Sequence, residues 1–334
     1  MGIYGTIKAR LSEKNQGRLI QSLYYSGLKP RINRKKSSPF KKGIVIFSAD
    51  FEMAWAFRYS KKRGHMAVEM GLRERENFDK ILGLFNHYNI PVTWATVGHL
   101  FLDQCSAEPE GIPHTEMPRP GHFENRNWLF NSGDWYQHDP CSSVQESPAW
   151  YAPDLIEKII QSKTKHEIGS HTFSHIDCTY KNCSKELMDA ELKKCVELAK
   201  LKGITMKSHV FPGGTFGNYE SLKENGFTNY RKPFENEIDI PVIDEFGLVR
   251  IPSSLGMDKD PYAWTASFHI KQFKKFLART VRSKQVCHFW FHPSMDPWYL
   301  EEVLPHVLAC VAEERDKGSI ELMTMNEMAE QMIR

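Results

Sequence analysis

The sequence has few cysteines, and their spacing suggests no pairing. Seven cysteines, an odd number, are scattered through 334 residues. A disulfide framework is typical of short secreted chains with an even cysteine set, so we expect reduced thiols here. The N-terminus lacks the apolar core and small-residue cleavage site of a secretory signal. Nor does any run approach the roughly 18 consecutive apolar residues of a membrane-spanning helix. The sequence therefore predicts a soluble cytoplasmic protein.

Acidic residues are scarce at the N-terminus. Residues 1–42 contain eleven Lys or Arg and one acid, Glu13, although the whole chain carries a net charge of only +3. A basic arm on an acidic body is not the pattern of a nucleic-acid-binding domain, so we expect no nucleic-acid partner. Apolar residues recur in the arm near helical spacing. The arm is thus either an amphipathic helix that contacts anionic lipid at the inner membrane face, or a helix packed on the body and followed by a basic linker.

Beyond residue 42, short apolar runs alternate with amphipathic stretches. The runs predict strands at 43–50, 91–98, 166–170, 209–211, 228–231, 248–251 and 286–292. The stretches between them predict helices at 75–88, 155–162, 184–201, 219–225, 268–281, 297–317 and 326–333. Such alternation favours a parallel sheet, and so many units favour a barrel. We expect an α/β domain over residues 43–334.

One long segment, residues 104–153, interrupts this alternation. It contains seven prolines and seven aromatic residues, a composition unlike that of disordered chains. Irregular segments of this length are usually functional, which favours the wall or lid of a substrate cleft. The alternative is a loop that only packs against the barrel.

The segment 166–177, HEIGSHTFSHID, contains two histidines four residues apart. One helical turn would place the imidazoles of His171 and His175 on the same side, where they suit a Zn²⁺-type ion. No glutamate follows the first histidine as in the HExxH motif, so a general base must come from elsewhere.

Two acids, Asp50 and Glu52, end the first predicted strand. A single acid there could merely cap the next segment, but a buried carboxylate needs a charged partner. One carboxylate and the two histidines could hold a metal ion, and the second carboxylate could accept a proton from water. This is the logic of metal-assisted hydrolysis.

Two later segments could complete such a site. The turn at Pro212, Gly213 and Gly214 exposes backbone amides that can stabilise an oxyanion. His292 follows an apolar strand and could protonate a leaving amine, and His288 lies on the same face of that strand. Either histidine could instead be a buried structural residue.

Four motifs, SADFE, HTFSH, FPGGTFGN and FWFHP, together resemble those of the polysaccharide deacetylase (NodB-homology) family. The D-x-E spacing is similar to a subgroup associated with surface-polysaccharide biosynthesis. Val210 stands where the family has an arginine that keeps the base charged, so we expect Arg231 or Arg250 to replace it. No clear counterpart exists of the family's Asp-Trp motif, which tunes the acid histidine.

The resemblance implies a distorted (β/α) barrel that removes an N-acetyl group from an amino sugar, in a polysaccharide or its lipid- or nucleotide-linked precursor. It implies Asp50 as the base and His292 as the acid. Glu52, His171 and His175 would bind a divalent metal, with Zn²⁺ favoured over Co²⁺, Ni²⁺ and Fe²⁺. The expected substrate-binding residues are Pro212, Gly213, Gly214, Trp290 and Arg231.

Other functions fit parts of this pattern. Some relatives, the allantoinase-like enzymes, open cyclic amides and can act without metal. An inactive carbohydrate-binding relative is also consistent with the missing arginine. Two histidines and a carboxylate further describe non-haem iron oxygenases, but their β-sandwich fold disagrees with the strand–helix alternation.

Overall fold

The structure is a computed structural model that describes residues 31–32, 37–109, 111–233, 237–258 and 264–334. The prediction of an amphipathic helix in the N-terminal arm falls on residues outside these ranges. From the arm, β1 (Arg31–Ile32) is described and pairs in parallel with β9 (Glu237–Ile238).

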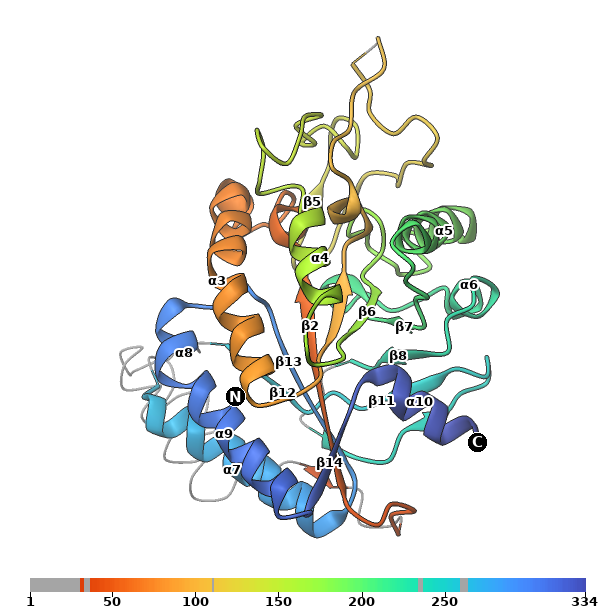
Figure 1. The fold of residues 1–334 in the computed structure, drawn as a ribbon. Coiled ribbons are helices and arrows are strands. Elements are labelled where there is room, and N and C mark those ends of the chain that lie inside the picture. The colour runs from red at the N-terminus through yellow and green to blue at the C-terminus, as the bar shows by residue number, and fades with distance from the viewer. Residues whose placement is uncertain (1–30, 33–36, 110, 234–236, 259–263) are drawn as a thin grey trace, which may run out of the picture.

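A curled, mostly parallel sheet forms the centre of the domain (Figure 1). Its strand order is β10-β11-β8-β7-β6-β3-β2-β13-β12, with β14 also paired to β2. The antiparallel pair is β10 with β11. The strands are β2 (Gly43–Phe51), β3 (Thr93–Thr96), β6 (Glu167–Ser170), β7 (Ser208–His209), β8 (Asn229–Arg231), β10 (Val242–Ile243), β11 (Val249–Ile251), β12 (Leu255–Gly256), β13 (Val286–Phe291) and β14 (Ile320–Met323).

Strand β2 is an interior strand of the sheet, and all nine of its residues are buried. Along one side it pairs with β13. Along the other side its first half pairs with β14 and its second half with β3. The carboxyl end of β2 is thus enclosed by two parallel neighbours, which is the edge of a parallel sheet where active sites gather.

Helices cover the sheet, and α3, α7, α8 and α9 gather on one side of it while α5 and α6 lie on the other (Figure 1). In the described part of the chain, none of the helices is long and apolar enough to span a membrane. The helices are α3 (Ala67–His87), α4 (Pro153–Ile160), α5 (Lys185–Leu201), α6 (Tyr219–Glu224), α7 (Ala266–Ser283), α8 (Pro297–Glu302), α9 (Leu304–Asp316) and α10 (Met325–Ile333).

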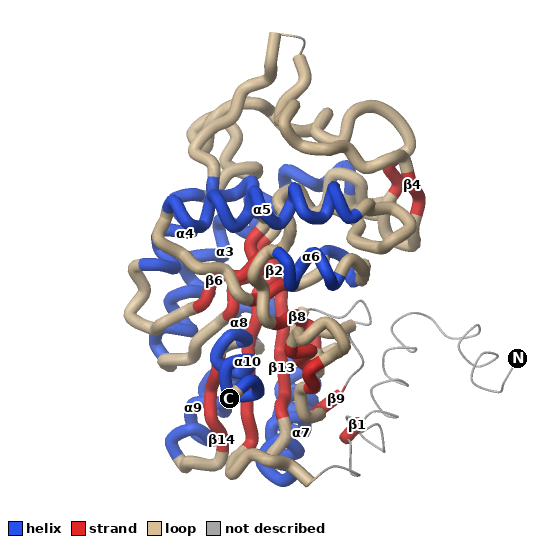
Figure 2. Tube along the Cα trace, turned by 90° about the vertical axis from the view of Figure 1, so that its right-hand side faces the viewer, coloured by secondary structure: helices blue, strands red, loops and turns tan. Residues whose placement is uncertain are grey.

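Four 3₁₀ turns stand between these elements: η1 (Met53–Ala56), η2 (Gly64–Met66), η3 (Gly98–Phe101) and η4 (Pro212–Gly214). The segment from η3 to α4 contains little regular structure beyond β4 (Phe123–Glu124) and β5 (Leu129–Phe130). It forms the loop-rich end of the molecule, above α4 and α5 in Figure 2.

The predicted (β/α) architecture is confirmed, with several differences. The sheet is a half-barrel, because its end strands β10 and β12 do not pair with each other among the described residues. The helix expected over 297–317 breaks at Val303, because a proline is tolerated in the first turn of α9 but not in the interior of a longer helix. Helix α3 begins at Ala67, earlier than expected, and β14 was not predicted.

Candidate active site

Two carboxylates stand at the carboxyl end of β2. Asp50 is the penultimate residue of the strand, and Glu52 follows directly after it. Both are buried, with 5% and 4% of their surface exposed. The backbone N–H of Glu52 donates to Oε1 of Glu74 on α3 at 3.1 Å, which fixes the chain where it leaves the strand. Both carboxyl groups line the same cavity.

The carboxylate of Glu52 lies between two imidazoles. Its Oε2 is 3.1 Å from Nε2 of His171 and 3.1 Å from Nε2 of His175. Nδ1 of His171 donates to the carbonyl of Val210 at 2.7 Å, so a neutral His171 presents the bare lone pair of Nε2 to Glu52. A lone pair this close to a carboxylate oxygen is repelled unless a cation lies between them. The donor set of two imidazole nitrogens and one carboxylate suits a divalent metal ion.

The protonation states agree with this donor set. Burial raises the pKa of Glu52, but His292, His171 and His175 together lower it well below its usual range. Burial lowers the pKa of His175 to about 4. Glu52 is therefore charged and His175 neutral near pH 7, as metal ligands must be.

The two histidines do not lie on a helix, and the predicted helical turn is wrong. The backbone between them has no regular structure, and His175 has a positive φ of 56°. Ser174 anchors this loop, since its N–H and O–H donate to the carboxylate of Glu191 at 2.8 and 2.7 Å. Its carbonyl accepts from Arg58 at 2.7 Å. These contacts to side chains replace the hydrogen bonds of a helix and bring both imidazoles to Glu52.

Arg231, at the end of β8, binds Asp50 through two hydrogen bonds. Its Nη1 and Nη2 donate to Oδ1 and Oδ2 of Asp50 at 2.6 and 2.7 Å. Nη1 also donates to Oγ of Ser48 at 2.9 Å. Burial raises the pKa of Asp50, but Arg231 more than offsets burial and holds this pKa below its usual value. Arg250, the other candidate for this position, is exposed on β11.

The two histidines of β13 and its end differ in their surroundings. Nε2 of His292 is 3.5 Å from Oε1 of Glu52 and 3.9 Å from Oδ2 of Asp50, and 31% of its side chain is exposed. His288 is fully buried, and its Nε2 lies 2.8 Å from Oγ of Ser48. Burial, together with nearby Arg231, lowers the pKa of His288 to about 3. His292 therefore reaches the cavity, whereas His288 is a buried neutral histidine that is hydrogen-bonded to Ser48.

A cavity of about 520 Å³ opens above these groups. Of the expected substrate-binding residues, Gly213, Gly214, Trp290 and Arg231 line it. Pro212, the first residue of the same turn, is buried and does not line the cavity. The Arg231 guanidinium lies 4.9 Å from the centre of the Trp290 ring, so that the indole forms the wall beside the arginine. The other lining residues are Asp50, Glu52, Ala56, Phe57, Ser60, Lys62, Arg63, His175, Val210, Phe211, Phe216, Lys232, Ser253 and His292.

A comparison with known protein families identifies the family of this chain. The sequence profile described as polysaccharide deacetylase matches residues 60–230, half of the chain. The chain belongs to the polysaccharide deacetylase family. Members of this family are hydrolases that act on N-acetyl amide bonds. No curated protein sequence matches the chain.

Solved structures share the fold. A Mycobacterium smegmatis protein described as a polysaccharide deacetylase superposes with a TM-score of 0.60 at 14% identity, over 92% of this chain and 95% of that one. A Pseudomonas aeruginosa PAO1 protein described in the same way gives 0.56 at 14% identity, over 86% and 89%. The PuuE allantoinase gives 0.57 at 15% identity, over 91% and 97%. At these identities the likeness shows a common deacetylase-type fold.

The long segment of this deacetylase-family chain packs against the barrel and does not offer aromatic faces to the cavity. Indole N–H of Trp135 donates to Oγ of Ser174 at 2.8 Å, and the Trp128 ring lies 5.0 Å from that of His175. The segment thus supports the loop of His171 and His175 from outside, as the alternative of a segment packed against the barrel predicts. All seven are buried and none lines the cavity: Phe123, Trp128, Phe130, Trp135, Tyr136, Trp150 and Tyr151.

Some residues of the site were not predicted. Ser48 lies two residues before Asp50, so the alternation of β2 could have placed it on the same face. Glu74 accepts a hydrogen bond from the Glu52 N–H. Nothing in the sequence indicates that this glutamate, on a helix, is buried. Burial, reinforced by Glu52, raises the pKa of Glu74 well above its usual range. Lys62 and Arg63 reach the cavity from an irregular stretch that no pattern marks.

Proposed function

We propose that this protein is a metal-dependent hydrolase that removes the N-acetyl group from an amino sugar. The proposal rests on one observation: the metal-type donor set Glu52–His171–His175 and the ion pair of Asp50 with Arg231 meet at one cavity. A carboxylate beside a metal-type donor set is the arrangement that metal-assisted hydrolysis requires.

Glu52, His171 and His175 are the residues that would hold the metal. Two imidazoles and one carboxylate fit Zn²⁺ best, and Co²⁺, Ni²⁺ and Fe²⁺ accept the same donors. The hydrogen bond from His171 to the Val210 carbonyl orients the ring and fixes its tautomer, as partners of metal-binding histidines do. A bound cation would supply an acidified water and polarise the acetamide carbonyl.

Asp50 is the proposed general base. Arg231 holds both carboxylate oxygens and keeps Asp50 charged at neutral pH, so that it can accept the proton of the attacking water. Ser48 and His288 in turn fix Nη1 of Arg231 through a chain of buried hydrogen bonds. The base is therefore positioned by groups on three strands, β8, β2 and β13.

His292 is the proposed general acid. Its Nε2 lies 3.9 Å from Oδ2 of Asp50, and the side chain is partly exposed and lines the cavity, so it can reach a bound substrate. Once the tetrahedral intermediate forms, the C–N bond breaks as Nε2 of His292 gives its proton to the departing amine. Acetate and the free amino sugar are the products.

The turn at Gly213 and Gly214 is the proposed oxyanion support. Both glycines line the cavity, and Gly213 has a positive φ of 55° that opens the backbone to the site. A peptide N–H there could donate to the oxygen that becomes negative during attack.

Positive charge near the cavity favours a phosphate-linked substrate. Lys62 and Arg63 are exposed and line the cavity. Basic side chains bind phosphate oxygens with charge-assisted hydrogen bonds. We therefore favour a nucleotide- or lipid-diphosphate-linked N-acetyl sugar, processed in the cytoplasm. The proposal includes contact of the N-terminal arm, residues 1–42, with an anionic membrane.

Acetate release from a panel of substrates tests the proposal. The panel contains a nucleoside-diphosphate N-acetylhexosamine, a polyprenyl-diphosphate N-acetylhexosamine, a neutral chitin oligomer and allantoin. We expect acetate from the diphosphate-linked sugars and a higher KM for them in the double variant Lys62→Ala, Arg63→Ala. Lys61→Ala is the matched control, because Lys61 pairs with Glu124 and does not line the cavity.

Three outcomes would contradict parts of the account. Equal turnover of the neutral oligomer would remove the phosphate preference. Ring opening of allantoin without acetate release would favour the cyclic-amide reaction. Sugar binding without any turnover would identify an inactive carbohydrate-binding relative.

A further inference from the structure

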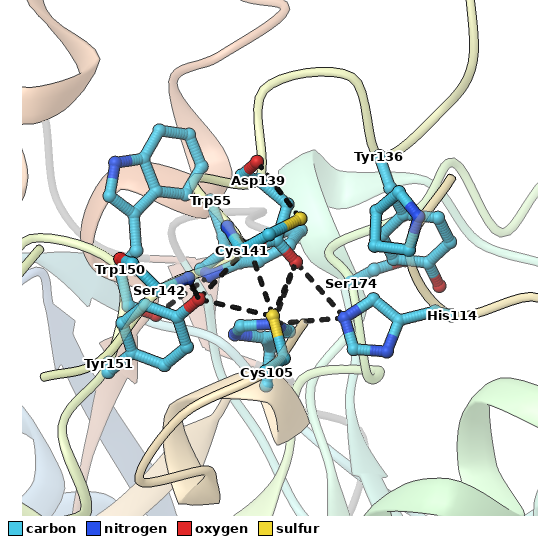
Figure 3. Close-up of polar contacts among 12 residues, drawn as sticks. Trp55, Cys105, His114, Tyr136, Asp139, Cys141, Ser142, Trp150, Tyr151 and Ser174 are labelled. Carbon is cyan, nitrogen blue, oxygen red and sulfur yellow. Dashed lines mark hydrogen bonds and ion pairs between the residues drawn. The ribbon is translucent and has the colours of Figure 1, made fainter. Parts of the chain in front are cut away.

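A second group of metal-ligating side chains lies outside the active-site cavity. His99 belongs to η3, and Cys105, His114 and Asp139 come from the long segment after it. Their ligand atoms all lie within 4.8 Å of one another. None of the four residues lines the cavity. Figure 3 shows the side chains of Cys105, His114 and Asp139 directed toward one another.

Hydrogen bonding alone explains this arrangement poorly. Oδ2 of Asp139 is 2.9 Å from Nε2 of His99 and 3.0 Å from Nε2 of His114. The two Nε2 atoms are 3.2 Å apart. If both nitrogens carried protons, the two hydrogens would crowd the same small space. If either were bare, its lone pair would face the carboxylate oxygen. A cation among the three atoms resolves both conflicts.

The distances suit a tetrahedral Zn²⁺ ion. Bonds of about 2.0–2.3 Å to nitrogen, oxygen and sulfur place neighbouring ligand atoms roughly 3.2–3.7 Å apart. Sγ of Cys105 is 3.4 and 3.5 Å from the two oxygens of Asp139. The nitrogen and oxygen atoms of the group are separated by 2.9–3.2 Å, slightly shorter than this range. One atom from each residue completes four-fold coordination.

Charge and burial agree with a dication. The side chains of His99 and Asp139 are fully buried, and that of His114 is 7% exposed. A thiolate at Cys105 and the carboxylate of Asp139 would neutralise two positive charges without any further counter-ion. Burying an ion is costly unless its charge is matched in this way.

Outer contacts orient the carboxylate of Asp139. Its Oδ1 accepts from the backbone N–H of Cys141 at 3.0 Å and from the hydroxyl of Tyr151 at 3.1 Å. That hydroxyl itself accepts from the backbone N–H of Ser142 at 3.1 Å. With Oδ1 occupied, Oδ2 is left as the atom that would bind the metal. Partners of this kind are typical of metal sites and set the ligand geometry.

We propose that His99, Cys105, His114 and Asp139 form a structural zinc site. All four positions would be filled by protein atoms, and closed sites of this kind are structural whereas catalytic ones keep a position open. The site does not depend on the proposed function, because it shares no residue with the active site.

The site would stabilise a long segment that has little regular structure. It ties η3 to three points of the chain between η3 and α4. That same segment contains Trp135, which donates to Ser174 in the histidine loop, and Trp128, which packs beside His175. Zinc binding at the second site would therefore hold the outer support of the active site in place.

Metal content and cobalt spectroscopy test this inference. One batch of protein is purified from medium with added zinc, and its zinc content is measured. A second batch is loaded with Co²⁺. We expect two metal ions per chain and a thiolate-to-cobalt charge-transfer band. The band reports the second site alone, because the active-site donors contain no sulfur. Cys105→Ser should lose one metal ion and the band, whereas Cys310→Ser, a partly buried cysteine on α9, should keep both.

His171→Ala distinguishes the two sites. It should lose the active-site metal and keep the charge-transfer band. If folded wild-type protein shows no such band, or if its Cys105 is found in a disulfide with Cys141, the inference is overturned. Should Cys105→Ser fail to fold, absence of zinc–sulfur scattering at about 2.3 Å in wild-type X-ray absorption would overturn it equally.

Discussion

Arg231 donates hydrogen bonds to both carboxylate oxygens of Asp50, at 2.6 and 2.7 Å, although the two residues are 181 positions apart in the chain. The arginine lies at the end of β8 and the aspartate at the end of β2, and both are buried. The pair therefore forms only when the sheet has curled. It keeps a buried carboxylate charged in the position where we place the general base.

The first prediction concerns this pair. Arg231→Gln leaves Asp50 buried without its cation, so the pKa of Asp50 should rise. Because the base must be charged, the acidic limb of the kcat/KM profile should move to higher pH. Loss of a charge-assisted hydrogen bond should also lower kcat/KM about 10- to 100-fold at pH 7. Arg250→Gln, on the exposed side of β11, is the control and should match wild type. An unshifted acidic limb in Arg231→Gln would contradict the assigned role.

The two carboxylates should differ when each is replaced by its amide. Asp50→Asn should lower kcat by about 10²–10⁴ while the active-site metal stays bound. Glu52→Gln should lose that metal, because Glu52 is the carboxylate between His171 and His175. Metal analysis beside the rate measurement separates the two cases. If Asp50→Asn lost the metal instead, Asp50 would be a ligand and the roles would be reversed.

Gly213 tests the contact between the long segment and the oxyanion turn. A Cβ at this position would lie 2.4 Å from the Trp128 ring, at a φ of 55°. Gly213→Ala should therefore reduce both thermal stability and turnover. Gly203→Ala is a matched control, because its φ is also positive, at 73°, but no atom lies within 4 Å of the added Cβ. The control should cost about 1 kcal/mol of stability and no activity. Equal losses in the two variants would show that backbone strain alone is responsible.

Buried neutral histidines predict a loss of stability in acid. Burial lowers the pKa of His269 on α7 to about 4, whereas an unfolded histidine titrates near 6.5. Below pH 6.5 the unfolded state therefore binds more protons, and the free energy of unfolding falls until the folded pKa is reached. This residue should contribute about 2 kcal/mol to the loss between pH 7 and 5. His269→Phe should flatten the thermal-unfolding profile over that range, and His306→Phe, at an exposed position, should not. Parallel profiles for wild type and His269→Phe would refute the assignment.

The sequence predicted the sheet better than the loops. Apolar runs such as 43–50 identified the strands because a buried parallel strand needs little more than hydrophobic side chains. The two acids at the carboxyl end of β2 and the histidine after β13 were found because strand ends converge at one edge. The conformation of the loop that carries His171 and His175 was not predicted. It depends on contacts with Glu191 and Arg58, which leave no local pattern in the sequence. The same holds for His99 and Asp139, whose spacing matches no metal motif.

Metal reconstitution tests the central claim most directly. The protein is depleted with a chelator, and acetate release from a diphosphate-linked N-acetyl sugar is followed as Zn²⁺ is returned. The account predicts that activity disappears on depletion and returns in proportion to zinc bound at the active site. It also predicts that Glu52→Gln stays inactive throughout. Acetate release that survives depletion, or that returns equally in Glu52→Gln, would contradict it.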